Sequence, residues 1–282
     1  MNTVFLNGQF VPYEEACISP EDRGFLFADG IYEVMRVYNG SLFRFEDHMA
    51  RLRFGGTTLD LRIPYTDEAF RDFIHQLLAH HDLCEASVYL QVTRGASPRR
   101  HPFPEEYDPT VFMMVRSVSA PEQAIIEQGV DVITHPDNRG GLCYIKTLNL
   151  LANCIAMTKA EAQGAYEALL VRNGFVTEAT ARSAFCVIDN RIYTYPLANI
   201  LPSITRKQVL AIARDAGSPV VEQALPVDTY INADEIFLGG TLCELVPVVR
   251  VDKKPVGSGV PGPVFQKVHS AFMQLIAEEC GT

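Results

Sequence analysis

The stretch Tyr144-Ile145-Lys146-Thr147-Leu148-Asn149 places one lysine between a glycine-rich loop, 139–141, and an apolar segment, 150–156. An ammonium group on an apolar wall loses hydration, which lowers the pKa of the lysine and leaves more free amine at neutral pH. A free amine beside an anion-binding pocket can form a Schiff base with a carbonyl group. The alternative is an exposed lysine at a strand end, whose stem lies over apolar neighbours. The stretch alone leaves both interpretations open.

Size and composition indicate a folded protein with two lobes. At 282 residues the chain is long for a single core. A hydrophobic content of 48% with 21% charged residues is typical of soluble globular proteins. The net charge of −10 argues against a nucleic-acid surface, and it makes local clusters of basic residues informative.

The cysteines and the apolar segments indicate a cellular location. The seven cysteines are spread through the chain, and no two have the spacing of a zinc knuckle or a redox pair. The pair His80-His81 cannot present both rings to one metal, so we expect no metal site. The N-terminus lacks the features of a signal peptide, and no apolar run is long enough to span a bilayer. We therefore expect a cytoplasmic protein that binds neither membranes nor nucleic acid.

The spacing of apolar residues and turn residues predicts hairpins mixed with single helices. Asn7-Gly8, Asn39-Gly40 and Asn173-Gly174 are predicted as hairpin turns. A helix that starts near Glu46 is expected to carry His48 and Arg51 outward. Further strands are predicted at 31–38, 88–92, 111–115, 130–133, 185–194 (a hairpin), 235–238 and 246–251, and helices at 66–78, 150–163, 205–216 and 265–276.

This pattern favours an α+β fold over a doubly wound parallel sheet. A polar segment marked by Pro121 indicates a domain boundary. We predict a small N-terminal α/β domain at 1–117, a linker at 118–123 and a larger C-terminal domain at 124–282.

A cofactor with a phosphate, a pyridine ring and an aldehyde needs three things from a protein: amides at a helix N-terminus with a cation, a group that sets the protonation of the ring nitrogen, and a lysine. For the phosphate, Ser203-Ile204-Thr205 opens a predicted helix, Gly239-Gly240-Thr241 ends a predicted strand, and Arg51 could supply the charge. Taken singly, these are equally compatible with a cap, a tight turn and a solvated arginine.

Candidates for the ring nitrogen and for the substrate lie elsewhere in the chain. Glu178 follows a predicted strand, where a carboxylate could keep a pyridinium protonated or could simply be an exposed strand-end acid. Arg94, Arg99, Arg100 and His101 crowd one loop of an acidic protein. Guanidinium groups bind carboxylates in bidentate fashion, so this loop is either a substrate-carboxylate site or a solvated basic loop.

Together these residues resemble the fold type IV enzymes that depend on pyridoxal phosphate (PLP), and within that family the resemblance is closest to the D-amino-acid aminotransferases. The resemblance covers nearly the whole chain, and its motifs occur in the family's order. They are Glu21-Asp22-Arg23-Gly24 with Asp29-Gly30-Ile31-Tyr32-Glu33-Val34, residues 92–101, Ile145-Lys146-Thr147-Leu148-Asn149, Val176-Thr177-Glu178 and Ile204-Thr205-Arg206.

The resemblance implies roles for individual residues. Lys146 would be the Schiff-base lysine, and Glu178 would pair with the pyridine nitrogen. The larger C-terminal domain would bind the cofactor, and in the family the arginine/histidine loop reaches in from the partner subunit, which implies a homodimer. The phosphate would be held by Arg51, Ile204, Thr205, Gly240 and Thr241, Leu201 would pack on the ring face, and the substrate α-carboxylate would be bound by Tyr32, Arg99 and His101.

The activity that the resemblance implies is transamination between a D-amino acid such as D-alanine and a 2-oxo acid, 2-oxoglutarate or pyruvate, by a ping-pong mechanism through an internal aldimine. An (R)-selective amine transaminase, a lyase similar to aminodeoxychorismate lyase and a non-catalytic binding protein are the alternatives. Two departures from the family pattern occur. Residues 179–183 include a bulky Arg182, and Gly240 with Leu242-Cys243 stands where hydroxyl groups are common.

Overall fold

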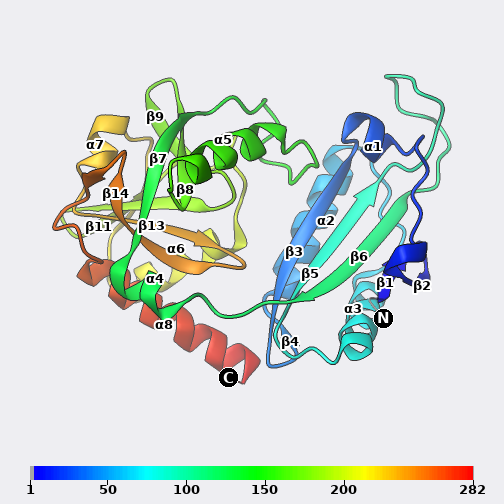
Figure 1. The fold of residues 1–282 in the computed structure, drawn as a ribbon, viewed down its shortest axis with the longest axis horizontal. Coiled ribbons are helices and arrows are strands. Elements are labelled where there is room, and N and C mark those ends of the chain that lie inside the picture. The colour runs from blue at the N-terminus through cyan, green and yellow to red at the C-terminus, as the bar shows by residue number, and fades with distance from the viewer. Residues whose placement is uncertain (1–2, 282) are drawn as a thin grey trace. The chain divides into compact units, whose positions relative to one another are not determined.

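The computed structural model describes residues 3–281, which divide into two compact units (Figure 1). The first unit extends to Ser119 and also includes Ile145–Asn149 and the residues from Glu279 onward. The second unit comprises Ala120–Tyr144 and Leu150–Glu278. The predicted linker, 118–123, includes the point at which the chain leaves the first unit, and the outermost predicted limits, 1 and 282, lie outside the described residues.

The first unit is an antiparallel sheet with helices on one face (Figure 1). Its described strands follow the order β2-β1-β6-β5-β3-β4. The strands are β1 (Thr3–Leu6), β2 (Gln9–Pro12), β3 (Gly30–Tyr38), β4 (Ser41–Leu42), β5 (Ala86–Thr93) and β6 (Thr110–Ser117), and the α-helices are α1 (Arg23–Phe27), α2 (Phe45–Thr58) and α3 (Asp67–His81).

The predicted Asn-Gly turns are confirmed. Asn7 has φ 50° and Gly8 has φ 92°, so both central residues adopt the left-handed conformation that a type I′ turn requires. The same conformation occurs at 39–40, between β3 and β4, and at 173–174 in the second unit. The helix predicted after Thr66 is also confirmed, since the Thr66 hydroxyl accepts a hydrogen bond from the N–H of Ala69.

The prediction that His48 and Arg51 point outward from α2 is wrong. Helix α2 packs against β3, and His48 is buried on that side of the helix. Both side chains contact Glu33, a carboxylate of β3 that is inaccessible to solvent. A buried carboxylate requires cationic or hydrogen-bonding partners, and this requirement overrides the usual preference of basic side chains for water.

The segment that contains Lys146 is joined to the start of β3. The N–H of Tyr32 donates to the carbonyl oxygen of Lys146 at 3.0 Å, and the N–H of Leu148 donates to the carbonyl oxygen of Gly30 at 3.1 Å. A Cβ at Gly30 would lie 2.8 Å from the Cδ1 atom of Leu148, so only glycine permits this approach. The predicted C-terminal domain contained residues 145–149. In the structure these residues belong to the first unit instead. The reason is that their backbone pairs with a strand more than 100 residues earlier.

The second unit is a mixed sheet with the described strands in the order β12-β11-β10-β13-β14-β7-β8-β9, with β15 paired to β14. The pairs β11/β12, β7/β14 and β7/β8 are parallel, and the other pairs are antiparallel, which confirms the α+β class. The strands are β7 (Val130–Pro136), β8 (Glu167–Arg172), β9 (Phe175–Ala179), β10 (Ser183–Ile188), β11 (Arg191–Thr194), β12 (Val220–Glu222), β13 (Glu235–Gly240), β14 (Glu244–Val251) and β15 (Lys254–Pro255). The remaining helices are α4 (Gln123–Gln128), α5 (Leu151–Ala162), α6 (Ile204–Asp215), α7 (Val227–Ile231) and α8 (Pro263–Cys280).

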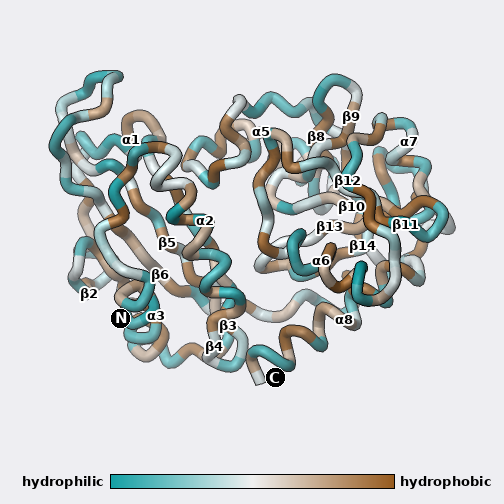
Figure 2. The backbone as a smooth tube through the Cα atoms, turned by 180° about the vertical axis from the view of Figure 1, so that it is seen from behind, coloured by the Kyte–Doolittle hydropathy of each residue, from teal (hydrophilic) through white to brown (hydrophobic). Residues whose placement is uncertain are grey.

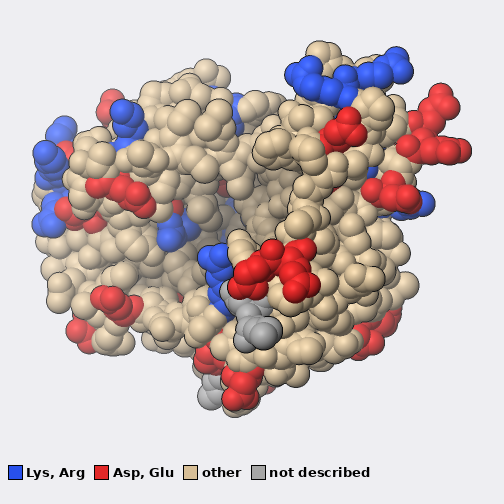
Figure 3. Space-filling model, turned by 45° about the vertical axis from the view of Figure 1, so that its right-hand side comes forward, with Lys and Arg blue, Asp and Glu red and all other residues tan. Residues whose placement is uncertain are grey.

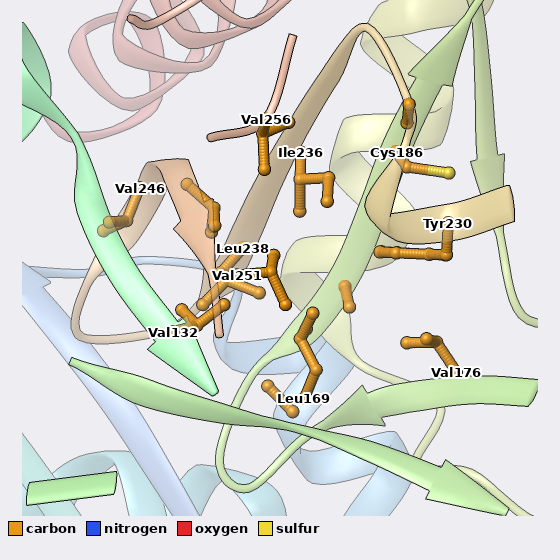
Figure 4. Close-up of a cluster of buried hydrophobic side chains, with 14 of the residues drawn as sticks. Val132, Leu169, Val176, Cys186, Tyr230, Ile236, Leu238, Val246, Val251 and Val256 are labelled. Atoms are coloured by element: carbon orange, nitrogen blue, oxygen red, sulfur yellow. The ribbon is translucent and has the colours of Figure 1, made fainter. Parts of the chain in front are cut away.

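Apolar side chains from these strands form the core of the second unit. Leu169, Ile236 and Leu238 point into a common cluster with valines from β7, β9 and β14 (Figure 4). Each of these three side chains is at most 1% exposed. The loop that follows β5 in the first unit is by contrast hydrophilic (teal in Figure 2). None of the helices in the described part of the chain has the length and apolar content that crossing a bilayer requires.

Candidate active site

Lys146 lies over the ring of Tyr32 in the first unit. The Nζ atom is 4.2 Å from the ring centroid, a distance at which an ammonium group is attracted to the aromatic face. The Tyr32 ring in turn packs against Tyr89, with the centroids 5.8 Å apart. The structure therefore brings together two residues that the sequence assigned to one site. Lys146 is half-buried, and its amine has an aromatic neighbour.

Arg51 is held by the buried carboxylate of Glu33. Its Nε and Nη2 atoms donate to the two oxygens of Glu33 at 2.7 and 2.8 Å, and Nδ1 of His48 lies 2.7 Å from Oε2 of the same carboxylate. Burial opposes ionisation, but the charge and hydrogen bonds of Arg51 with those of His48 lower the pKa of Glu33 to about 2. Burial lowers the pKa of His48. Glu33 therefore stays ionised and fixes the guanidinium.

Glu178 is buried at the C-terminal part of β9 and receives Arg139. The Nη1 atom of Arg139 lies 2.5 Å from Oε1 of Glu178, and the N–H of Leu201 lies 3.4 Å from the same oxygen. Burial raises the pKa of Glu178, and the guanidinium of Arg139 opposes this rise. The predicted ring-nitrogen carboxylate and the predicted ring-face residue thus adjoin each other.

A second carboxylate, Asp137, holds Arg139 in place. Arg139 donates through Nε and Nη2 to the two oxygens of Asp137, both at 2.9 Å. Asp137 also accepts from the hydroxyl of Thr177 at 2.9 Å and pairs with Arg172 at 2.8 Å. Burial opposes ionisation, yet the contacts with Arg139 and Thr177 lower the pKa of Asp137 to about 2. From the sequence, Arg139 is visible only as part of a glycine-rich loop, and the spacing Asp137-x-Arg139 is the available signal for its role.

The start of α6 and the end of β13 meet in the second unit. Ser203 caps α6, with its hydroxyl accepting from the N–H of Arg206 at 3.2 Å. The first N–H groups of a helix have no acceptor within the helix and carry partial positive charge. A Cβ at Gly239 would lie 3.2 Å from the Cγ2 atom of Thr205, so glycine allows the strand to approach the helix. Of the five residues predicted to bind the phosphate, Ile204 and Thr205 begin α6, while Gly240 and Thr241 lie at and just after the end of β13, which approaches α6 at Gly239. Their meeting at a phosphate stays a prediction.

Arg99 and His101 lie on the exposed loop that follows β5. The guanidinium carbon of Arg99 is 5.2 Å from the ring centroid of Phe27, and the His101 ring is 5.8 Å from the same ring. These two side chains thus gather at α1, and their meeting with Tyr32 at a substrate stays a prediction. Arg94 has a different role from its neighbours, because it is buried and its Nε atom donates to Asp29.

Charged side chains of both signs lie on one face of the molecule (Figure 3). Basic (blue) and acidic (red) side chains are interspersed on the face shown in Figure 3. Among residues 3–281 there is no group of three or more His, Cys, Asp or Glu side chains that could hold a metal ion.

Comparison with known proteins identifies the family. Residues 30–251, which are more than half of the chain, match the family described as amino-transferase class IV. This chain belongs to the class IV amino-transferases.

Two similar proteins are D-alanine aminotransferases. The protein from Bacillus licheniformis is 36% identical over 277 residues, which are 98% of each chain. The protein from Listeria monocytogenes serotype 4b (strain F2365) is 39% identical over 282 residues, which are 99% of this chain and 97% of the relative. A solved structure, the T.th. branched-chain amino acid aminotransferase with pyridoxamine 5'-phosphate, superposes with a TM-score of 0.91. Its sequence is 26% identical, and the match covers 99% of this chain and 95% of that one.

In this class IV amino-transferase the unusual Arg182 is engaged inside the second unit. Its Nη1 atom donates to Glu167, a carboxylate with no exposed surface. Its Nη2 atom donates to the hydroxyl of Tyr166 at 3.2 Å, and its Nε atom donates to the sulfur of Cys243 at 3.0 Å. A Cβ at Gly240 would lie 3.3 Å from the Cγ atom of Arg182. The bulk of Arg182 is therefore accommodated beside Gly240, where a side chain would crowd it.

Proposed function

We propose that this class IV amino-transferase moves the amino group of a D-amino acid such as D-alanine to a 2-oxo acid, 2-oxoglutarate or pyruvate, with pyridoxal phosphate as its cofactor. The similarity to D-alanine aminotransferases along almost the full chain supports the choice of substrate. The single structural observation that carries the chemistry is the amine of Lys146, held 4.2 Å above the Tyr32 ring in a segment paired to β3.

The residues present fit this cofactor. Arg51, with Ile204, Thr205, Gly240 and Thr241, would hold the phosphate. The approach of Gly239 in β13 to Thr205 at the start of α6 supports this assignment, because helix N-terminal amides and close backbone approach suit a phosphate. Glu178 would face the ring nitrogen and Leu201 the ring. When bound, pyridoxal phosphate supplies an aldehyde and an electron-withdrawing ring that stabilises negative charge at the substrate Cα.

The chain's own residues would supply the proton chemistry and the orientation. Lys146 is proposed as the covalent attachment point and as the base that takes the proton from the substrate Cα. Arg139 and Asp137 would keep the carboxylate of Glu178 in one position, so that it does not reorient when the ring binds.

Tyr32, Arg99 and His101 are proposed to bind the substrate α-carboxylate. Guanidinium, imidazole and phenol groups are all hydrogen-bond donors to a carboxylate. We further propose a homodimer in which Arg99 and His101 are contributed by the partner copy. The exposed position of both side chains supports this arrangement. A cytoplasmic location is also proposed, and the free thiols of all seven cysteines support it.

The decisive experiment replaces Lys146 by alanine. We expect Lys146→Ala to abolish transfer from D-alanine to 2-oxoglutarate, because no other group would attach the cofactor and move the Cα proton. Lys159→Ala, an exposed lysine of α5, is the matched control and should retain full activity. The measurement is pyruvate formation, with circular dichroism to verify that both variants fold.

The same assay separates the alternatives. Turnover by folded Lys146→Ala would contradict the proposal. Pyruvate released from aminodeoxychorismate without any amino acceptor would instead indicate a lyase, and preference for an amine without a carboxylate would indicate an amine transaminase. L-Alanine is the control for the handedness of the substrate.

A further inference from the structure

The loop that contains Arg99 and His101 is anchored by a buried arginine of α1. Arg23 is 3% exposed, and its Nη1 and Nη2 atoms donate to the carbonyl oxygens of Arg100 and His101 at 2.6 and 3.3 Å. The backbone N–H of Arg23 also donates to the carbonyl oxygen of Gly95, at the start of the same loop, at 2.8 Å. One residue thus restrains the loop both at its start and at residues 100–101.

Arg23 is itself fixed to the sheet through Asp29. Its Nε atom donates to Oδ2 of Asp29 at 2.6 Å, and Nε of Arg94 donates to the same oxygen at 3.0 Å. Arg94 continues to the carbonyl oxygens of Leu59 and Asp60, both at 2.8 Å, just after α2. Since Arg23 and Arg94 are both buried, these charge-assisted bonds are shielded from water and hold Arg23 rigidly.

The ring of Phe27 gathers the two exposed side chains of the loop. The guanidinium carbon of Arg23 is 4.8 Å from the ring centroid and that of Arg99 is 5.2 Å away, while the His101 ring lies at 5.8 Å. Within residues 3–281 neither Arg99 nor His101 uses its side chain in an ion pair or hydrogen bond. The aromatic contact therefore sets their directions and leaves their donors available.

We propose that Arg23 and Phe27 are positioning residues for substrate recognition. Arg23 fixes the backbone at residues 100–101, and Phe27 fixes the directions of Arg99 and His101, so that both donors meet the α-carboxylate of the amino acid. If the loop were held only for stability, the hydrogen bonds from Arg23 to the loop backbone would be sufficient. A role in substrate recognition also explains why the side chains of Arg99 and His101 both contact the Phe27 ring. This inference rests on the proposed function.

The test compares carboxylate recognition with cofactor binding in the holoenzyme. In Arg23→Lys an ammonium replaces the planar guanidinium and cannot bridge two carbonyl groups and a carboxylate at once. We expect the KM for D-alanine and the inhibition constant of propionate, which offers a carboxylate without an amine, to rise together by roughly 10-fold or more. The change in kcat should be far smaller, and the affinity for pyridoxal phosphate, measured by absorbance titration, should be unchanged.

Phe27→Leu should show the same pattern, and it carries the test if Arg23→Lys fails to fold. Phe25→Leu is the matched control, because Phe25 lies on the same helix and is 77% exposed. In an Arg99→Ala background, Arg23→Lys should raise the KM by a smaller factor than in the wild type, since one of the two donors that it positions is already absent.

The outcomes separate this inference from the proposed function. The positioning role is refuted, and the proposed function stands, if Arg99→Ala raises the KM for D-alanine while Arg23→Lys and Phe27→Leu leave it unchanged. Fully additive effects of Arg23→Lys and Arg99→Ala on this KM would have the same meaning. If the wild-type holoenzyme does not transaminate D-alanine, or if Arg99→Ala changes nothing, the proposed function fails first and the positioning role fails with it.

Discussion

Arg139 is placed between two carboxylates, with Asp137 on one side and Glu178 on the other. The two acids respond differently, because the pKa of Asp137 is lowered to about 2 while burial raises the pKa of Glu178. Asp137 therefore serves as the permanent anion that orients the guanidinium. Glu178 is the carboxylate whose ionisation depends on that guanidinium.

Removing the guanidinium should change the pH dependence of catalysis. In Arg139→Met the largest influence that lowers the pKa of Glu178 is lost and only the Leu201 N–H still opposes burial, so this pKa rises further and the carboxyl takes up a proton at higher pH. As the pH falls, activity that needs the ionised carboxylate of Glu178 is then lost at a higher pH than in the wild type. We expect the acid limb of kcat/KM against pH to move upward by about one to three units. The exposed Arg191→Met is the control, and an acid limb that coincides in all three proteins would refute the dependence.

Arg182 and Glu167 form a buried pair whose loss should be costly for stability. Arg182→Met leaves the Glu167 carboxylate in the interior without its cation, which destabilises proteins by about 3–5 kcal/mol. Adding Glu167→Gln removes the uncompensated charge and should restore much of that loss. Urea denaturation of the single and double variants measures both effects. Equal stability of the wild type and Arg182→Met would mean that Arg182 is only a solvated surface residue.

At the scale of residues, the sequence does not show which charged side chains pair with one another. Lys146 and Glu178 could be selected from local context and family resemblance, and their positions in a site remain predictions. The partners could not be found in this way. Glu33 binds Arg51 18 positions later, and Arg139 binds Glu178 39 positions later. A local pattern contains no information about which distant charge will meet a buried carboxylate.

At the scale of elements, the turns and strands were the most predictable parts. Asn-Gly pairs have an intrinsic preference for left-handed backbone, and alternating apolar residues identify a strand whatever surrounds it. The orientation of α2 was not predictable in the same way. Its basic residues resemble those of a solvated face, and only contact with Glu33 on β3 turns that face inward.

The approach of β13 to α6 gives a prediction about the cofactor. In Gly239→Ala the new Cβ would lie 3.1–3.2 Å from Leu245, Phe185 and Thr205, so the end of the strand or the start of the helix must move. Overpacking of this kind costs about 1–3 kcal/mol of free energy. We expect it to weaken the binding of pyridoxal phosphate by about tenfold. The dissociation constant is measured by absorbance titration.

Gly141→Ala serves as the control for this substitution, since no atom lies within 4 Å of its added Cβ. Equal affinities in Gly239→Ala and wild type would show that the cofactor does not depend on this contact.

At the scale of the whole molecule, the proposed dimer can be tested by complementation. If Lys146 and Arg99 of one site come from different copies, a mixed dimer of Lys146→Ala and Arg99→Ala has one intact site and one site with both defects. Random mixing should then restore about a quarter of the wild-type activity, because half of the dimers are mixed and each has one working site.

The measurement is D-alanine transamination after unfolding and refolding the two variants together, with each variant refolded alone as the control. If both residues of a site came from one copy, every site in the mixture would remain defective and activity would not recover.

The membership of residues 145–149 in the first unit has a practical consequence for protein engineering. The chain leaves that unit after Ser119, returns to add five residues beside β3, and leaves again. A gene fragment that stops at residue 119 would encode a sheet whose Tyr32 amide has lost its acceptor, and no single scission separates the polypeptide into two self-sufficient halves. Expression of the N-terminal half would require residues 145–149 to be grafted back through an engineered tether.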